Sequence, residues 1–211
     1  MSNDIDNVTP KGVLLVVSGP SGAGKGTICQ MLRDQLPDLG YSISVTTRAP
    51  RTGEVDGESY FFKTIPEVKQ MIEKGELLEY AEVYGNYYGT LRSEAEKIVN
   101  SGRDLILEIE VDGAGQIKKL LGDECTAVML IAPDHKELER RLRGRGTDSE
   151  EAILNRLATA RKEISLAPMY DYIVVNENGK VEECAENIVA IIKAERQKYS
   201  RREDFISHYF D

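Results

Sequence analysis

A glycine-rich loop, GPSGAGKGT, occupies residues 19–27 of this 211-residue chain and restricts the folds that are open to it. It directly follows a short apolar run at 13–17 and opens a stretch with helical periodicity at 27–36. Glycine admits the backbone conformations that turn successive N–H groups inward around a phosphate, and the positive end of the following helix strengthens the attraction. Lys25 adds a fixed positive charge for the β- and γ-phosphates of a nucleotide. The order strand, loop, lysine and helix therefore predicts a P-loop nucleotide site.

One position departs from the usual P-loop. Gly26 stands where Ser or Thr normally follows the lysine, and the hydroxyl is delayed to Thr27. The hydroxyl that is missing here normally binds Mg²⁺, so the metal is expected to be held by phosphates and water. Thr27 is expected to contact a phosphate, and it is the one candidate for a direct contact with the metal. The Gly-Lys-Gly-Thr sequence resembles the loop of adenylate kinases. The predicted ATP-binding residues of the loop are Gly19, Pro20, Ser21, Gly22, Ala23, Gly24, Lys25, Gly26 and Thr27.

The rest of the chain predicts an α/β fold. Continuous apolar runs are typical of strands buried on both faces, and they lie at 13–17, 105–109, 127–132 and 172–175. Amphipathic stretches of helical length lie between or after them, at 27–36, 113–121, 135–143, 150–166 and 181–198. Strands that alternate with helices indicate a central parallel sheet covered on both sides, a three-layer sandwich of the P-loop NTPase type.

Two segments interrupt this alternation. Residues 41–90 are rich in aromatics, Gly and Thr, with one helical patch at 66–74, which predicts a small mixed α+β insertion. Residues 144–149 carry two glycines and an arginine, which is typical of a mobile lid. The expected division is a core at 11–40 and 91–198 with a helical lid at about 134–165, the insertion at 41–90, and terminal extensions at 1–10 and 199–211.

Composition limits the partners. The net charge of −9 argues against binding to a nucleic-acid backbone. Cys29, Cys125 and Cys184 are far apart and lack zinc-site spacing, so we expect unpaired thiols in a reducing compartment. The polar N-terminus does not resemble a secretion signal, and no apolar stretch approaches the length of a membrane span. The expected location is the cytoplasm, without a membrane partner.

The insertion carries a second phosphate-binding pattern. Arg48 and Arg51 lie three residues apart in a proline-containing loop, and Tyr60 follows nine residues later, which forms a plausible clamp for a phosphate group. Further along come GELLEYAEV at 75–83 and GNYYGT at 85–90. With these blocks the sequence closely resembles the guanylate kinases, from residue 12 to about residue 178.

The resemblance implies roles for these residues. Arg48, Arg51, Tyr60 and Tyr88 are expected to hold the phosphate of GMP. Ser44 and Thr90 are expected near guanine O6, and Glu79 is expected to accept hydrogen bonds from N1–H and the 2-amino group. The chemistry is complementary, because guanine has an acceptor at O6 and donors at N1 and N2, whereas adenine lacks both donors.

Acidic residues crowd the end of the predicted strand at 105–109. In the family an acidic residue here lies near guanine and the metal-bound waters, and Glu110 is the candidate for that role. Glu108 also keeps the charge, and Asp112 stands where the family has an amide. The simpler interpretation, capping of a helix that begins at Gly113, suits Asp112 best.

The resemblance also implies that Arg145 and Arg156 lie over the transferring phosphoryl group. Arg140, Arg141 and Arg143 are expected to form a solvated helix face. Asn176, at the end of the last strand, is expected to contact the adenine of ATP.

The predicted activity is ATP + GMP ⇌ ADP + GDP, a step in purine nucleotide metabolism. The acceptor oxygen is already ionised, so catalysis should consist of positioning and charge neutralisation by Mg²⁺, Lys25, Arg48, Arg145 and Arg156. Two alternatives stay open: another small P-loop kinase of adenylate or phosphoribosyl type, and a catalytically silent guanylate-kinase-like module that binds peptides. The use of dGMP and the choice between monomer and homo-oligomer are open as well.

Overall fold

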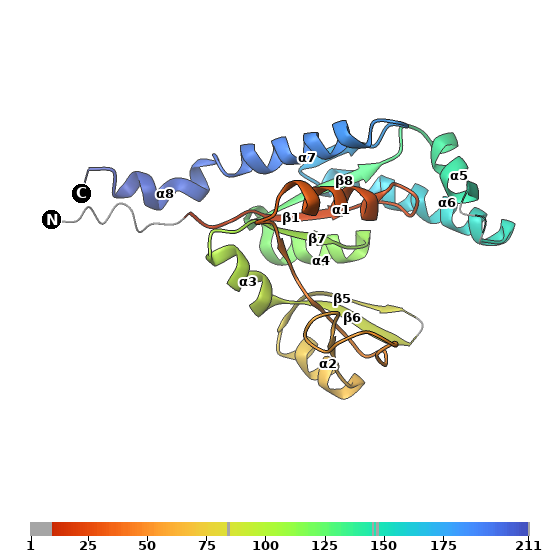
Figure 1. Cartoon of the computed structure of the whole chain (residues 1–211), viewed down its shortest axis with the longest axis horizontal. Coiled ribbons are helices and arrows are strands. Elements are labelled where there is room, and N and C mark those ends of the chain that lie inside the picture. Colours follow the sequence, from red (N-terminus) through yellow and green to blue (C-terminus); the bar gives the residue numbers. More distant parts are fainter. Residues whose placement is uncertain (1–9, 84, 145, 147, 211) are drawn as a thin grey trace.

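Two β-sheets organise the computed structural model of the chain, which describes residues 10–83, 85–144, 146 and 148–210 (Figure 1). The larger sheet is parallel throughout and has the strand order β2-β7-β1-β8-β9. Its strands are β1 (Leu14–Ser18), β2 (Gly40–Tyr41), β7 (Leu105–Glu108), β8 (Cys125–Ile131) and β9 (Tyr172–Val175). The four predicted apolar runs are therefore β1, β7, β8 and β9.

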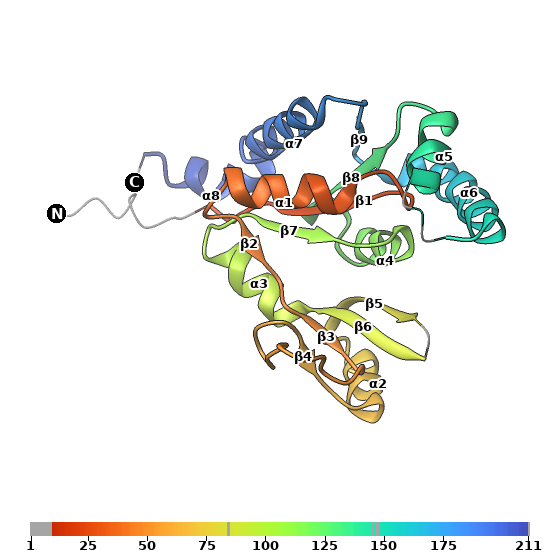
Figure 2. The ribbon, with the colours of Figure 1, turned by 45° about the vertical axis from the view of Figure 1, so that its right-hand side comes forward.

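Helices cover both faces of the larger sheet (Figure 2). Leu15 and Val17 of β1 pack against α1 (Lys25–Gln35) and α7 (Val181–Glu195). Leu14 and Val16 point the other way, toward α3 (Arg92–Asn100) and α4 (Val111–Leu121). Because alternate residues of one strand feed two separate apolar cores, every residue of β1 is buried. The predicted three-layer α/β sandwich is confirmed.

The smaller sheet lies to one side of the larger one (Figure 2) and has the order β4-β3-β6-β5. Its strands are β3 (Ser44–Thr46), β4 (Phe61–Phe62), β5 (Leu77–Val83) and β6 (Asn86–Leu91). Helix α2 (Ile65–Glu73) covers it, and Val45, Val68 and Leu77 form the centre of its own core. A capping box starts α2, because Thr64 Oγ1 accepts from the Glu67 backbone while the Glu67 carboxylate accepts from the Thr64 N–H.

Helices α5 (His135–Gly144) and α6 (Glu150–Ser165) form a separate pair with a third small apolar core that includes Leu138, Leu142 and Ile153. Ser149 starts α6, since its hydroxyl accepts a hydrogen bond from the Ala152 N–H. Short 3₁₀ turns precede β8 and β9, at Gly122–Glu124 and Ala167–Met169.

Several elements differ from the expectation. Strand β2 and helix α3 were not predicted, and part of the C-terminal extension is helical, α8 (Tyr199–Ser207). Helix α4 begins at Val111, with Glu110 as its N-cap residue. Asp112 therefore lies inside the first turn, and the prediction that it caps the helix is wrong. An acidic side chain there still interacts favourably with the positive end of the helix.

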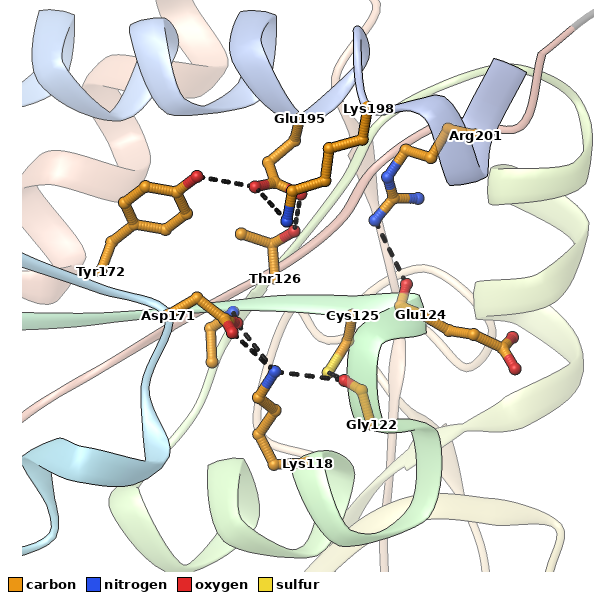
Figure 3. A network of polar contacts seen from close by, with 11 residues as sticks. Lys118, Gly122, Glu124, Cys125, Thr126, Asp171, Tyr172, Glu195, Lys198 and Arg201 are labelled. Atoms are coloured by element: carbon orange, nitrogen blue, oxygen red, sulfur yellow. Dashed lines mark hydrogen bonds and ion pairs between the residues drawn. The ribbon is translucent and has the colours of Figure 1, made fainter. Parts of the chain in front are cut away.

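A polar network joins α7 to the larger sheet (Figure 3). The Glu195 carboxylate is only 1% exposed, and it accepts hydrogen bonds from Thr126 Oγ1 at 2.9 Å and from Tyr172 OH at 2.7 Å. Lys198 Nζ lies 2.8 Å from the same carboxylate. Burial by itself raises the pKa of Glu195, but hydrogen bonds from Lys198, Tyr172 and Thr126 outweigh it and lower that pKa.

Cys29, Cys125 and Cys184 are all free and buried. Burial raises the pKa of Cys29 to about 12, so its thiol stays protonated. Within the described residues, no helix combines the length and the apolar character that crossing a membrane requires.

Candidate active site

The glycine-rich loop joins β1 to α1. Three of its glycines, Gly19, Gly22 and Gly24, have positive φ, and two of them also leave no room for a Cβ against the backbone or a buried amide. Gly19 has φ +144°, and a Cβ there would lie 2.1 Å from the Leu130 carbonyl oxygen. Gly24 has φ +99° at the start of α1, and a Cβ there would lie 2.4 Å from Asn176 Nδ2. The loop is therefore pressed against the ends of β8 and β9, with its backbone in the conformations that a phosphate cradle requires.

The side chains behind the loop hold its backbone in place. Asn176 is 5% exposed, and its Nδ2 donates to the Ala23 carbonyl at 2.8 Å. Arg141 Nη2 donates to the Asn176 carbonyl at 2.7 Å, and its Nε donates to Glu137 at 2.7 Å. The expectation that Arg141 lies on a solvated face is wrong, because this residue supports the loop from behind. Arg140, in contrast, has a side chain that is 62% exposed.

Lys25 reaches back over the loop. Its Nζ donates to the Gly19 carbonyl at 2.6 Å and lies 3.4 Å from Glu110 Oε2. The Lys25 side chain is 10% exposed, whereas that of Glu110 is 72% exposed. The ammonium group is therefore fixed inside the curve of the loop, where a nucleotide phosphate would bind. Glu110, predicted to contact GMP, lies beside this loop.

The positive end of α1 faces further carboxylates. A Cβ at Gly26 would lie 3.4 Å from Glu108 Oε1, so Glu108 stands next to the position where other P-loops have their metal-binding hydroxyl. The pKa of Glu163 is raised by burial and then by the negative charge of Glu110. In the described part of the chain, no group of three or more His, Cys, Asp or Glu side chains is placed to hold a metal ion. Carboxylates beside the loop suit a Mg²⁺ ion that keeps its own water ligands.

Helix α6 carries Arg156 to the loop. Its Nη1 donates to Ser21 Oγ at 2.9 Å, and its Nε lies 3.3 Å from Asp148 Oδ2. One of the two arginines expected over the transferred group thus already touches the phosphate loop. Arg145 lies outside the described residues.

In the smaller sheet, three predicted guanine-binding residues come together from adjacent strands. Ser44 of β3 pairs with Thr90 of β6, and Thr90 pairs with Glu79 of β5. Thr90 Oγ1 donates to Glu79 Oε1 at 2.7 Å, and Glu79 is 8% exposed. Burial raises the pKa of Glu79, although hydrogen bonds from Thr90 act in the opposite direction. A buried acceptor and two hydroxyls therefore lie side by side.

The predicted phosphate-binding residues of the insertion form a second cluster around Arg48. Its guanidinium carbon lies 5.4 Å from the centre of the Tyr60 ring, and the rings of Tyr60 and Tyr88 lie 6.3 Å apart, edge to face. The backbone N–H of Arg51 donates to Glu54 Oε2 at 2.7 Å. Arg48, Tyr60 and Tyr88 are thus adjacent, and Arg51 is held to the same loop.

Sequence reasoning missed Glu54, which forms a two-point ion pair with Arg48 at 2.8 and 2.9 Å. These hydrogen bonds lower the pKa of Glu54 to about 2, so it stays ionised. The signal was present as an acid three residues after Arg51 in a turn, but nothing in the sequence shows which arginine it pairs with.

The first turn of α4 lies between the two groups of residues. Its N-cap, Glu110, is beside Lys25, while a Cβ at Gly113 would lie 3.0 Å from Glu79 Oε2. One helix end therefore adjoins both the phosphate loop and the buried carboxylate of the insertion.

The guanylate kinase family model matches residues 11–195, which include the loop, the insertion and helices α5 and α6. The chain belongs to the guanylate kinase family. A guanylate kinase of Shouchella clausii is 49% identical over 94% of this chain and 94% of its own length. A guanylate kinase of Clostridioides difficile is 46% identical over 95% of this chain and 96% of its own.

The crystal structure of the guanylate kinase from Anaplasma phagocytophilum has the same fold. It aligns with a TM-score of 0.68 at 34% identity, covering 91% of this chain and 90% of the other. Membership of the guanylate kinase family favours a guanylate kinase over the adenylate-type and silent-module alternatives, since the match includes both the insertion and the loop with Lys25.

Proposed function

We propose that this chain transfers the γ-phosphoryl group of ATP to GMP, giving ADP and GDP. The observation that carries the proposal is the buried carboxylate of Glu79, held by Thr90 on one side and adjoining the first turn of α4 on the other. A buried carboxylate is costly unless a partner repays its desolvation. The N1–H and 2-amino donors of guanine are such a partner, and adenine has neither.

Ser44 and Thr90 complete the base pocket. Ser44 pairs directly with Thr90 across β3 and β6, so the two residues lie on one face of the smaller sheet beside Glu79. The Ser44 hydroxyl can donate to guanine O6, whereas adenine has an amino group at that position. Thr90 is proposed to lie near the same O6, but it donates its single hydroxyl proton to Glu79 and so orients the carboxylate. Arg48, Arg51, Tyr60 and Tyr88 then receive the phosphate of GMP, through charge-assisted hydrogen bonds from the arginines and phenol donors.

Phosphoryl transfer needs no general base in this scheme, because the attacking oxygen of GMP is already ionised. Lys25 neutralises charge on the β- and γ-phosphates of ATP, Arg48 holds the acceptor phosphate, and Arg156 reaches the loop from α6. Arg145 is proposed to join them from the segment between α5 and α6. Asn176 acts on the ATP side by holding the loop at Ala23, next to the expected adenine position.

Mg²⁺ supplies charge neutralisation on the phosphates of ATP when it is bound. Glu108 and Glu110, which lie beside the loop, would accept hydrogen bonds from its water ligands, and Thr27 would contact a phosphate. The assignment of 41–90 as the GMP-binding insertion, of about 134–165 as the lid, and of the cytoplasm as the location belongs to the same proposal. A closing insertion and lid would exclude water and suppress hydrolysis of ATP.

The test is a coupled assay of ADP release with GMP, AMP, UMP and CMP as acceptors. We expect kcat/KM for GMP to exceed that for AMP by roughly 10⁴, because AMP leaves the polar groups of the pocket unpaired. Equal rates with AMP and GMP would favour the adenylate-type alternative. Binding of GMP without any phosphoryl transfer would favour the silent module.

A further inference from the structure

Helix α4 makes a polar contact with the insertion that the proposed reaction does not itself require. Gln116 Oε1 accepts a hydrogen bond from the Tyr80 N–H at 3.1 Å, and Gln116 Nε2 donates to the Tyr80 carbonyl at 2.9 Å. The side-chain amide thus pairs with both backbone groups of one residue, as a neighbouring strand would. Tyr80 directly follows Glu79.

The contact falls on an otherwise open edge. Strand β5 is the last strand of the order β4-β3-β6-β5, so among the residues that the structure describes its outer N–H and C=O groups have no partner strand. Its register against β6 shifts between Leu77 and Glu79, which is a local irregularity of the bulge type. Leu77 packs in the core of the insertion and Leu78 in the main core, because successive side chains of a strand point to opposite faces. The Gln116 amide therefore contacts the outer edge of β5 just after this irregularity.

Helix α4 is a rigid support for that contact. Ala114 and Ile117, on either side of Gln116, are buried in the main core beneath the larger sheet. One turn earlier, Gly113 leaves room for the carboxylate, because a Cβ there would lie 3.0 Å from Glu79 Oε2. Two residues of α4 thus affect Glu79. Gln116 fixes the backbone of Tyr80, the next residue, and Gly113 leaves space for the carboxylate because it has no side chain.

We propose that Gln116 is a positioning residue for guanine recognition, which together with Gly113 fixes the Glu79 carboxylate relative to the phosphate loop. The inference rests on the proposed function of Glu79. Gln116 does not touch the base; it sets the backbone from which the recognising carboxylate projects. Since the N-cap of the same helix lies beside Lys25, Gln116 also fixes the distance between the base pocket and the phosphate loop.

The test compares GMP with IMP, which has the O6 acceptor and N1–H donor of GMP but lacks its 2-amino group. Loss of the Gln116 amide allows Glu79 to move, so the second hydrogen bond, which GMP alone can make, should suffer most. In Gln116→Ala we expect kcat/KM for GMP to fall by about tenfold, with a smaller fall for IMP and an unchanged KM for ATP. General loosening of the protein would lower the values for GMP and IMP together.

Two further variants make the result decisive. Gly113→Ala should lower the ratio of GMP to IMP activity in the same way by crowding the carboxylate, even if Gln116→Ala fails to fold. Gln30→Ala is the matched control, because Gln30 is exposed on α1 and its amide donates to Asp34 at 2.9 Å within the same helix. If the wild type prefers GMP but both variants keep its ratio, the inference is overturned and the proposed function stands. A wild type that does not distinguish GMP from IMP overturns the inference, whereas the proposed function is overturned only if AMP is used as well as GMP.

Discussion

The Glu54 carboxylate binds both terminal nitrogens of the Arg48 guanidinium, with Oε1 2.8 Å from Nη2 and Oε2 2.9 Å from Nη1. Nη1 also donates to the Ala49 carbonyl at 2.8 Å. A guanidinium has five N–H donors, so these three contacts leave Nε–H and the second N–H of Nη2, on the side where Tyr88 also interacts with Arg48. Glu54 thereby orients the arginine that we assign to the phosphate of GMP.

Replacing Glu54 with Gln should weaken GMP binding and leave ATP binding alone. The substitution removes a charge-assisted pair, so Arg48 becomes free to sample other rotamers, and KM for GMP should rise by about tenfold. Steady-state kinetics with each substrate varied in turn measure both constants. Glu58→Gln, at an exposed position of the same loop, is the control. A KM for GMP equal to that of the wild type would show that Glu54 does not orient Arg48.

The raised pKa of Glu79 predicts the pH dependence of GMP use. Glu79 must be ionised to accept both guanine donors, so kcat/KM for GMP should fall on acidification through this raised pKa, at a higher pH than an ordinary glutamate would give. Glu79→Gln should remove this fall of kcat/KM in acid, the acid limb of the pH profile. The variant should also lose most of its discrimination between GMP and AMP, with a loss equivalent to several kcal/mol in kcat/KM for GMP. Profiles of the wild type, Glu79→Gln and the exposed control Glu76→Gln decide the point; an acid limb that survives in Glu79→Gln belongs to another group.

The raised pKa of Glu79 also predicts that the Glu79→Gln variant is more stable than the wild type. For a carboxyl group whose pKa is higher in the folded than in the unfolded state, the folded protein loses stability as pH rises through that window. Above that window the ionised Glu79 therefore opposes folding in the absence of GMP. Glu79→Gln should raise the free energy of unfolding by about 1 kcal/mol, seen as a higher Tm in nucleotide-free protein. A lower Tm would contradict the assigned burial cost.

Lys25→Ala should abolish most turnover without unfolding the protein. The ammonium group is the fixed charge inside the loop, and loss of one such stabilising group costs about 10²–10³ in kcat. Circular dichroism and single-turnover ADP release provide the measurements, with Lys119→Ala on the exposed face of α4 as the control. Near-normal activity of Lys25→Ala would refute the role of the loop.

Glu195→Gln should destabilise the protein without changing its kinetics. The variant removes the charge that three donors from β8, β9 and the segment after α7 satisfy, at a cost of about 1–3 kcal/mol. Because the pKa of Glu195 is lowered on folding, its contribution is complete above the unfolded-state pKa and is lost as pH falls through the lowered value. Urea titrations at neutral and acid pH should therefore show a penalty that shrinks in acid. Glu186→Gln, exposed on the same helix, should show no penalty at either pH.

The sequence predicted those parts of the fold in which burial or backbone conformation leaves a visible pattern of residues. The runs at 13–17 and 127–132 are apolar throughout because β1 and β8 are covered on both faces, and the loop at 19–27 is defined by the backbone conformations that its glycines allow. Strand β2, in contrast, has only two residues, Gly40–Tyr41, so no periodicity can reveal it. Helix α3 buries only Ala95 fully, which leaves its apolar pattern too weak to recognise.

Contacts between distant residues were beyond the sequence. Arg141 reads as one of several arginines on a helix, and only the fold shows that it reaches a carbonyl at Asn176. Gln116 lies 36 positions from Tyr80 in the chain and has no motif around it. Guanine-binding residues were predictable in kind from the family resemblance, whereas the residues that orient them depend on how helix and strand pack.

The buried thiols provide a chemical probe for local opening of the main core. Cys29 and Cys184 pack in the same core, on α1 and α7, and burial holds the pKa of Cys29 near 12 and that of Cys184 near 11. Alkylating reagents attack thiolates, so in the closed sandwich both sulfurs are doubly protected, by exclusion and by protonation. The rate at which these two thiols are alkylated therefore reports how often α1 and α7 separate from the sheet. A nucleotide that binds the loop at the start of α1 should lower that rate.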